Sequence, residues 1–246
     1  MNPQKGEILC FNKPYTWTSF DLVNKVRGIL RHRTRNRKLK VGHAGTLDPL
    51  ATGVLIICSG KATKRIDELQ ADVKEYIATM KLGATTPSFD KETEEDATYP
   101  TDHITKELVE ATLQRFVGTI EQIPPSFSAV RVNGKRAYQM ARKGQEIELK
   151  PKQLTIDEIE LMSCELPSQI VIRVVCSKGT YIRALARDIG TALGSGAYLT
   201  DLCRTRIGKY KLADCLDITE FDDWLNNQTI EIESENETIQ KPNHNV

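Results

Sequence analysis

The strongest constraint on the fold is a glycine-containing turn that runs directly into an apolar strand, within residues 42–55. Gly45 and Gly53 permit backbone conformations that are closed to other residues, and Pro49 pushes Asp48 out of the helical region. Residues 54–58 then form an unbroken apolar run of strand length, which predicts a buried strand. The Asp48 carboxylate is therefore expected on a stiff turn anchored to the core, as a catalytic group needs to be.

Composition indicates an ordinary water-soluble chain. Its 246 residues are 39% apolar and 27% charged, which is enough for one large domain or two small ones. No run of about 18 apolar residues could span a bilayer, and no leader segment is evident, so we expect a cytoplasmic protein with no membrane partner. Six cysteines lack the short paired spacing of a zinc site and predict reduced core thiols. We therefore expect no metal and no cofactor.

The net charge of +1 conceals a strong asymmetry along the chain. The first basic run holds Arg27, Arg31, Arg33, Arg35, Arg37, Lys38 and Lys40. The second holds Arg131, Lys135, Arg136, Arg142, Lys143, Lys150 and Lys152. Residues 212–240 contain nine acidic residues and no basic one. Either basic run alone would by default be a solvated loop, but two runs on either side of the Asp48 turn favour a polyanion as partner.

Apolar periodicity predicts a mixture of strands and helices. Strands are expected at residues 6–11, 54–58, 74–82, 153–161, 170–176 and 199–207. Helices are expected from the capping box of Thr18 and Asp21 onward, at 62–69, at 104–117 with Gly118 closing it, and at 182–193. Because the elements do not alternate strictly, the sequence predicts an α+β fold with a largely antiparallel sheet and flanking helices.

Three segments have no such periodicity. Residues 31–40 predict a mobile basic loop, and residues 85–102 a long polar one. Residues 123–152 predict an excursion from the core that contains a hairpin at Asn133-Gly134 and a basic helical segment stopped by Gly144. Its length and charge make it a candidate clamp on a phosphate backbone.

The run His43-Ala44-Gly45-Thr46-Leu47-Asp48-Pro49-Leu50-Ala51-Thr52-Gly53 resembles the active-site motif of the bacterial tRNA pseudouridine-55 synthases of the TruB type. Four further segments resemble that family in the same order: Asn12-Lys13-Pro14, the strand of Tyr76, Ile123-Pro124-Pro125-Ser126 and Tyr181-Ile182-Arg183. The resemblance covers about residues 6–212 and implies the pseudouridine synthase fold.

The resemblance also implies a domain organisation. We expect a catalytic domain at residues 1–225 with an RNA-clamping insertion at about 123–152, followed by a disordered acidic tail at 226–246. The C-terminal RNA-binding PUA domain of larger family members would follow near Leu212, and we expect the chain to lack it.

The family's reaction implies roles for individual residues. A uridine at position 55 of the tRNA T loop is flipped out, its N-glycosidic bond is broken, and the uracil is rejoined through C5. Asp48 would be catalytic as a nucleophile or as a base in an elimination, and the residues leave both routes open. Arg183 would pair with Asp48, and Tyr76 would lie under the flipped base.

The resemblance further implies two binding sets and a partner. The substrate-binding set is His43, Tyr181, Lys13, Gly45, Thr46 and Leu47, with Lys13 and Pro14 supporting the site rather than reacting. The RNA-backbone set is Arg33, Arg35, Arg37, Lys38, Arg131, Lys135 and Arg136. The expected partner is the T-arm stem-loop of tRNA, bound by a monomer.

Alternatives from other classes are less well supported. A non-catalytic RNA-binding protein would have no use for Asp48 together with Arg183. A nucleoside hydrolase would need a metal or a second positioned carboxylate and would not need the basic runs. A pseudouridine synthase acting on another RNA stays open.

Overall fold

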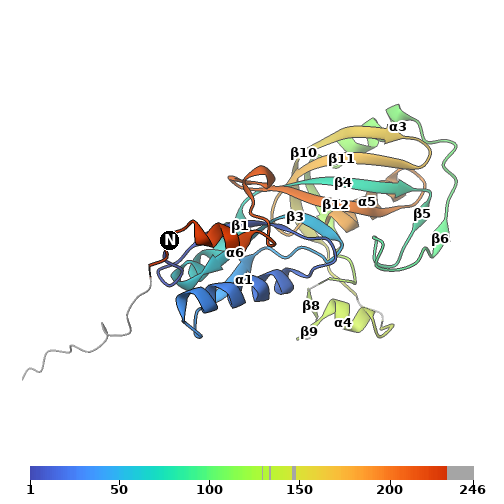
Figure 1. Ribbon diagram of the computed structural model, residues 1–246. Helices are drawn as coiled ribbons and strands as arrows, with labels where there is room; N and C mark the ends of the chain where they lie inside the picture. Colours follow the sequence, from blue (N-terminus) through green and yellow to red (C-terminus); the bar gives the residue numbers. More distant parts are fainter. Residues whose placement is uncertain (129, 133, 146–147, 232–246) are drawn as a thin grey trace, which may run out of the picture.

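The computed structural model describes residues 1–128, 130–132, 134–145 and 148–231. Within these ranges nine strands form one mixed sheet whose neighbours are mostly antiparallel, with helices flanking it (Figure 1). The predicted α+β architecture is confirmed.

The main path of the sheet runs through β1 (Ile8–Lys13), β3 (Ala51–Ser59), β12 (Ala197–Ile207), β4 (Lys74–Leu82), β11 (Gln169–Cys176), β10 (Lys152–Glu165) and β7 (Gly118–Gln122). Off this path, β2 (Val41–Ala44) pairs with β3, and β13 (Tyr210–Lys211) with β12. Two short hairpins join β5 (Ala84–Thr85) to β6 (Ala97–Thr98) and β8 (Arg131–Val132) to β9 (Lys135–Arg136). The helices are α1 (Ser19–Thr34), α2 (Ile66–Ala71), α3 (Lys106–Gln114), α4 (Ala137–Ala141), α5 (Ile182–Ala192) and α6 (Phe221–Asn226), with 3₁₀ turns η1 (Gly60–Arg65) and η2 (Leu212–Asp214).

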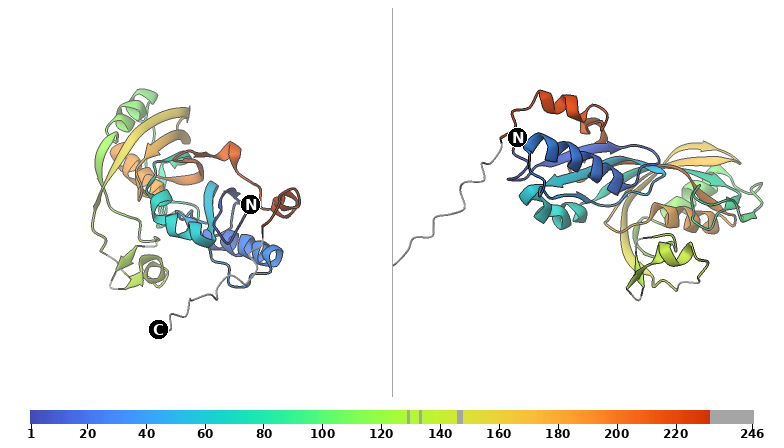
Figure 2. Two further views of the ribbon diagram at one scale, coloured as in Figure 1. Left: turned by 90° about the vertical axis from the view of Figure 1, so that its left-hand side faces the viewer. Right: turned by 60° about the horizontal axis from the view of Figure 1, so that its bottom comes forward.

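The two ends of the sheet have separate cores. At one end, α3 and α5 cover β4, β11 and β10, and apolar residues such as Leu185, Ile172 and Met80 are fully buried there. At the other end, α1 and α6 cover β1 and β3, and the rings of Phe11 and Phe221 meet edge to face at 5.0 Å (Figures 1 and 2). The cleft described below lies where these two ends meet.

The two ends join where β3 and β12 pair in parallel. Gly53 faces Arg204 in this register and has a φ of +101°, and a Cβ on Gly53 would lie 2.2 Å from the Arg204 backbone oxygen. Only glycine fits so close a backbone approach. The turn that carries Asp48 is thereby placed at the centre of the sheet.

Helix α1 begins as predicted and ends later than predicted. Thr18 and Asp21 form the capping box, which is confirmed. The helix continues to Thr34, and Arg31 donates to the backbone oxygen of buried Leu39. The prediction of a mobile loop over residues 31–40 is therefore wrong, because apolar contacts of α1 and Leu39 fix this segment.

Other boundaries also differ from prediction. Gly118 opens β7 rather than closing α3, and the loop of residues 85–102 contains the β5–β6 hairpin. The amide of Glu231 donates to the oxygen of Met1, and the Met1 amino group donates to Thr229, so an unstructured tail from residue 226 starts too early. Residues 232–246 lie outside the described residues.

Two features are absent from the described residues. None of the helices there combines the length and apolar character needed to cross a membrane. No group of three or more His, Cys, Asp or Glu side chains there could hold a metal ion.

Candidate active site

The turn that carries Asp48 is fixed through its backbone on the side of α1. Ser19, the first residue of α1, uses its Oγ twice: the amide of Leu47 donates to it at 2.8 Å, and it donates to the Leu47 oxygen at 3.0 Å. Both residues are buried. The helix start and the turn therefore hold each other in one conformation.

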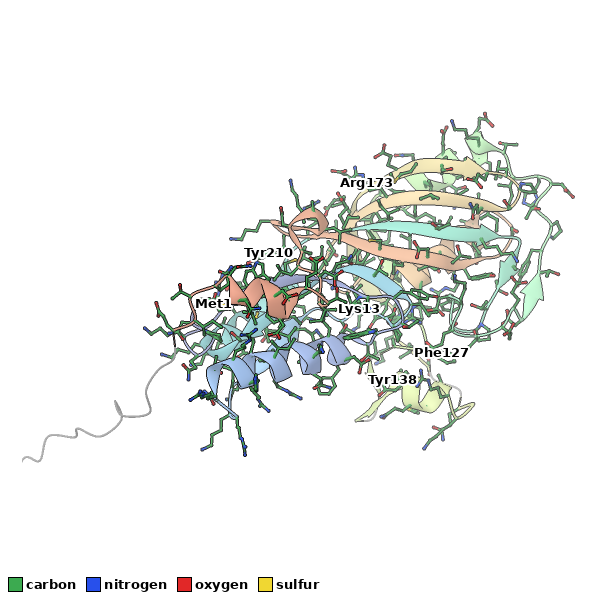
Figure 3. All side chains as sticks on the ribbon, in the orientation of Figure 1. Met1, Lys13, Phe127, Tyr138, Arg173 and Tyr210 are labelled. Carbon is green, nitrogen blue, oxygen red and sulfur yellow. The ribbon has the colours of Figure 1, made fainter. Side chains whose placement is uncertain are left out.

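Lys13 fixes the other side of the same turn. It is fully buried, and its Nζ donates to the oxygens of Pro14, Trp17 and Pro49 at 2.8, 2.5 and 3.2 Å (Figure 3). Burial lowers the pKa of Lys13 to about 8. The expectation that Lys13 binds substrate is wrong for this structure, because its three donors are occupied; it supports the turn.

Arg204 on β12 holds the start of the turn and was not predicted as a site residue. Its guanidinium donates to the oxygens of Gly45 and Thr46 at 3.0 and 3.3 Å, and to Val54 at 2.8 Å. An arginine in an otherwise apolar strand was the available signal, but its partners are backbone groups that no sequence pattern reveals.

Arg183 lies in the first turn of α5, as predicted, and is buried. Its Nε is 2.9 Å from Oδ2 of Asp48. Its two Nη atoms donate to the oxygen of Ser88 at 3.1 Å and to that of Phe127 at 2.8 Å. One side chain thus joins the catalytic turn, the loop of residues 85–102 and the base of the insertion.

Asp90 is a second carboxylate at this site that sequence reasoning missed. It is buried, with Oδ2 3.6 Å from the Arg183 Nε, and its Oδ1 accepts from the Ser88 hydroxyl at 2.6 Å and the Glu92 amide at 2.9 Å. In sequence Asp90 is one of several acidic residues in a polar loop, so only the fold distinguishes it.

The electrostatics of Asp48 reflect opposing influences. Burial raises the pKa of the Asp48 carboxyl, the Arg183 guanidinium acts against that rise, and the Asp90 carboxylate adds to it. The side chain keeps 39% of its surface open. That surface faces a concave cleft with little room for bulk solvent, which is why burial still dominates the direction of the pKa.

The cleft has a volume of about 720 Å³, which suits a nucleotide-sized ligand. The expected site residues that line it are Asp48, Arg183, Tyr76, Tyr181, Gly45, Thr46 and Leu47. His43 is half-buried on β2 and is not part of this lining. Burial lowers the pKa of His43, which favours the neutral ring at neutral pH.

The insertion lies beside the cleft. Ser128 and Val130 contribute to the lining, and the amide of Tyr138 donates to the Ser128 oxygen (Figure 3). Helix α4 projects from one side of the sheet (Figure 2), and Arg142 just beyond it pairs with Glu92 at 2.6 Å. The insertion is therefore tied to the same loop that supplies Asp90.

The expected RNA-backbone residues fall into three groups. Arg33 is engaged by α6, with Asp222 at 2.7 Å and a hydrogen bond to Asn226, so its expected availability to phosphates is wrong for this structure. Exposed Arg35, Arg37 and Lys38 follow α1, which at 16 residues is roughly 24 Å long and carries them away from Asp48. The side chains of Arg131, Lys135 and Arg136 lie outside the described part of the structure.

The mixed sheet and the cleft with a carboxylate held by a buried arginine define the class: the chain has the fold of the pseudouridine synthases, isomerases that modify RNA. The model of the "TruB family pseudouridylate synthase (N terminal domain)" matches residues 31–182. The model of the "tRNA pseudouridylate synthase B C-terminal domain" matches residues 183–240. The chain therefore belongs to the TruB family.

Curated relatives support this assignment over almost the whole chain. A tRNA pseudouridine synthase B of Phocaeicola vulgatus is 67% identical over 94% of this chain and 98% of the relative. The protein of the same name in Bacteroides thetaiotaomicron is 64% identical over 96% of this chain and 100% of the relative. In Flavobacterium johnsoniae the identity is 50% over 92% and 100%.

Solved structures agree on the fold. A Cbf5-Nop10-Gar1 complex contains a chain with a TM-score of 0.68 and 28% identity, covering 92% of this chain and 56% of that one. An H/ACA RNP bound to a substrate RNA containing 2'-deoxyuridine gives 0.64 and 27%, over 90% and 53%. The chain thus spans about half the length of these structural relatives.

Proposed function

We propose that this enzyme converts uridine 55 in the T loop of tRNA to pseudouridine, with Asp48 as the catalytic carboxylate. The observation that carries the proposal is the 2.9 Å pair of Asp48 and buried Arg183 in a nucleotide-sized cleft. The names of the curated relatives support tRNA as the substrate.

The geometry suits a reaction with one carboxylate. Uracil is a tolerable leaving group because its carbonyl groups spread the charge on N1, so a second acid is not required. Asp48 attacks the sugar or removes a ribose proton, and Arg183 orients it and favours its charged form. The uracil then turns and bonds to the sugar through C5.

A flipped uridine needs a stacking partner and a dry site. Tyr76 on β4 lines the cleft opposite the open surface of Asp48 and supplies an aromatic face. The insertion beside the cleft closes over the bound loop and excludes water, which would otherwise trap the detached sugar.

The finer assignments follow from the same site. The cleft is built from one chain, which supports action as a monomer, and tRNA as substrate supports a cytoplasmic location. The exposed basic residues Arg35, Arg37 and Lys38 are long-range candidates for phosphate contacts.

The decisive experiment uses Asp48→Asn with unmodified tRNA transcript. The amide keeps the shape but loses the charge, so we expect the rate to fall at least about 10³-fold, or roughly 4 kcal/mol of barrier. Pseudouridine is mapped by a chemical adduct that stops reverse transcription, and a transcript with cytidine at position 55 is the control. Activity within tenfold of the natural enzyme, with deamidation excluded, contradicts the role of Asp48. Equal modification of a ribosomal RNA fragment would favour another substrate.

A further inference from the structure

Arg204 is a buried cation in contact with no carboxylate. Its side chain is 1% exposed, and among the described residues no acidic group lies within ion-pair distance of it. A buried charge is costly unless it is well hydrogen-bonded. The three backbone oxygens that it binds compensate part of that cost, and two of them belong to the turn that carries Asp48.

The same guanidinium also reaches Tyr76. The two residues are register partners on the adjacent antiparallel strands β12 and β4, and both line the cleft. A side-chain hydrogen bond joins them: burial raises the pKa of Tyr76, and the Arg204 guanidinium acts against that rise. Arg204 is therefore in contact with both the catalytic turn and the aromatic group beneath the bound base.

The direction of this hydrogen bond follows from chemistry. A guanidinium has five N–H donors and no acceptor, so the Tyr76 oxygen must accept. The hydroxyl proton of Tyr76 then points away from Arg204. Because Tyr76 lines the cleft, that proton is available to a group of the bound nucleotide.

We propose that Arg204 is a positioning residue for the isomerisation: it fixes the carbonyls of Gly45 and Thr46 and turns the Tyr76 hydroxyl into the cleft. Arg204 itself does not react. It couples the turn that breaks the glycosidic bond to the tyrosine that faces the base, so that both are set before RNA binds. This rests on the proposed function, because the coupling matters only if uridine reacts at Asp48.

The experiment compares Arg204→Lys with Arg206→Lys. Lysine keeps the charge at position 204 but cannot hold several oxygens in a plane. Arg206 is two residues further on the same strand and pairs with Glu75 at 3.5 Å, away from the turn, so it is the matched control. We expect Arg204→Lys to lower the single-turnover rate on tRNA at least about 30-fold with Kd within about threefold, and Arg206→Lys to stay near the natural rate. An unchanged rate, or a weakened Kd with an unchanged rate, overturns the proposal.

A double-mutant cycle with Tyr76→Phe tests the coupling. If Arg204 acts partly through the Tyr76 hydroxyl, Arg204→Lys must cost at least about threefold less on the Tyr76→Phe background. The same cost on both backgrounds overturns this half of the proposal. A natural enzyme that does not modify tRNA would instead contradict the proposed function, which separates the two failures.

Should Arg204→Lys fail to fold, the coupling is tested in the folded Tyr76→Phe protein. Arginine labelled with ¹⁵N in the guanidinium gives slowly exchanging signals for buried groups. We expect one such signal to shift between the natural protein and Tyr76→Phe. Identical guanidinium spectra mean that Arg204 does not contact the hydroxyl, and overturn the proposal.

Discussion

Replacement of Ser19 by alanine tests whether activity depends on the rigidity of the catalytic turn. Ser19 Oγ is the partner of both the amide and the oxygen of Leu47, and both residues are buried. The change leaves two backbone groups without a partner, each at a cost of about 1–3 kcal/mol. We expect a decrease of about 2–4 kcal/mol in the free energy of unfolding, because part of the cost is recovered as the turn relaxes. Relaxation also displaces Asp48, for which we expect a rate decrease of about 10- to 100-fold.

Thr18→Ala is the matched control. Thr18 caps the same helix through the Asp21 amide, so its replacement destabilises α1 by about 1 kcal/mol without touching the turn. Stability is measured by urea denaturation, and the rate by single turnover with enzyme in excess, where both variants are folded. If Ser19→Ala reacts within threefold of Thr18→Ala, the hydrogen bonds to Leu47 are only structural and the reasoning is refuted.

Three further outcomes are expected. Asp90→Asn removes a negative charge that raises the pKa of Asp48, so the acid limb of the rate profile should move to lower pH; a shift to higher pH would contradict the arrangement around Arg183. Neutralising Arg35, Arg37 and Lys38 together should reduce the log–log salt slope of RNA binding by roughly 0.7–0.9 for each phosphate that is no longer neutralised, whereas Arg33→Gln should change it less because that residue is paired with α6. An isolated T-arm hairpin should be modified with a specificity constant within about tenfold of full tRNA, a difference below roughly 1.4 kcal/mol, since the acidic segment after Leu212 repels phosphates; a hundredfold preference for full tRNA would reveal distant binding sites on the RNA.

Local patterns predicted the elements that local chemistry determines. The capping box of Thr18 and Asp21 sets the start of α1, and the alternation over residues 74–82 gives β4 with the bounds expected. The end of α1 was missed because the charged residues at its last turn hide the apolar contacts that continue the helix.

The site was predictable only where a motif carried it. Asp48 and Arg183 come from segments far apart in the sequence, and family resemblance rather than periodicity brought them together. Asp90 and Arg204 act through partners that tertiary folding supplies, so nothing nearby in sequence marks them. Arg33 shows the converse error: its charge suggested a phosphate contact, but its partner Asp222 lies 189 residues away.

The distribution of cations around Asp48 has a consequence for its reactivity. Three buried cations surround the turn, and two of them, Lys13 and Arg204, donate to backbone oxygens. Within the described residues Arg183 is the one cation at ion-pair distance from the carboxylate itself. A carboxylate that accepted several strong hydrogen bonds would be well stabilised but a poor nucleophile or base. Holding the backbone rather than the carboxylate keeps Asp48 in place while its open surface stays directed at the cleft, where the ribose of a flipped uridine would lie.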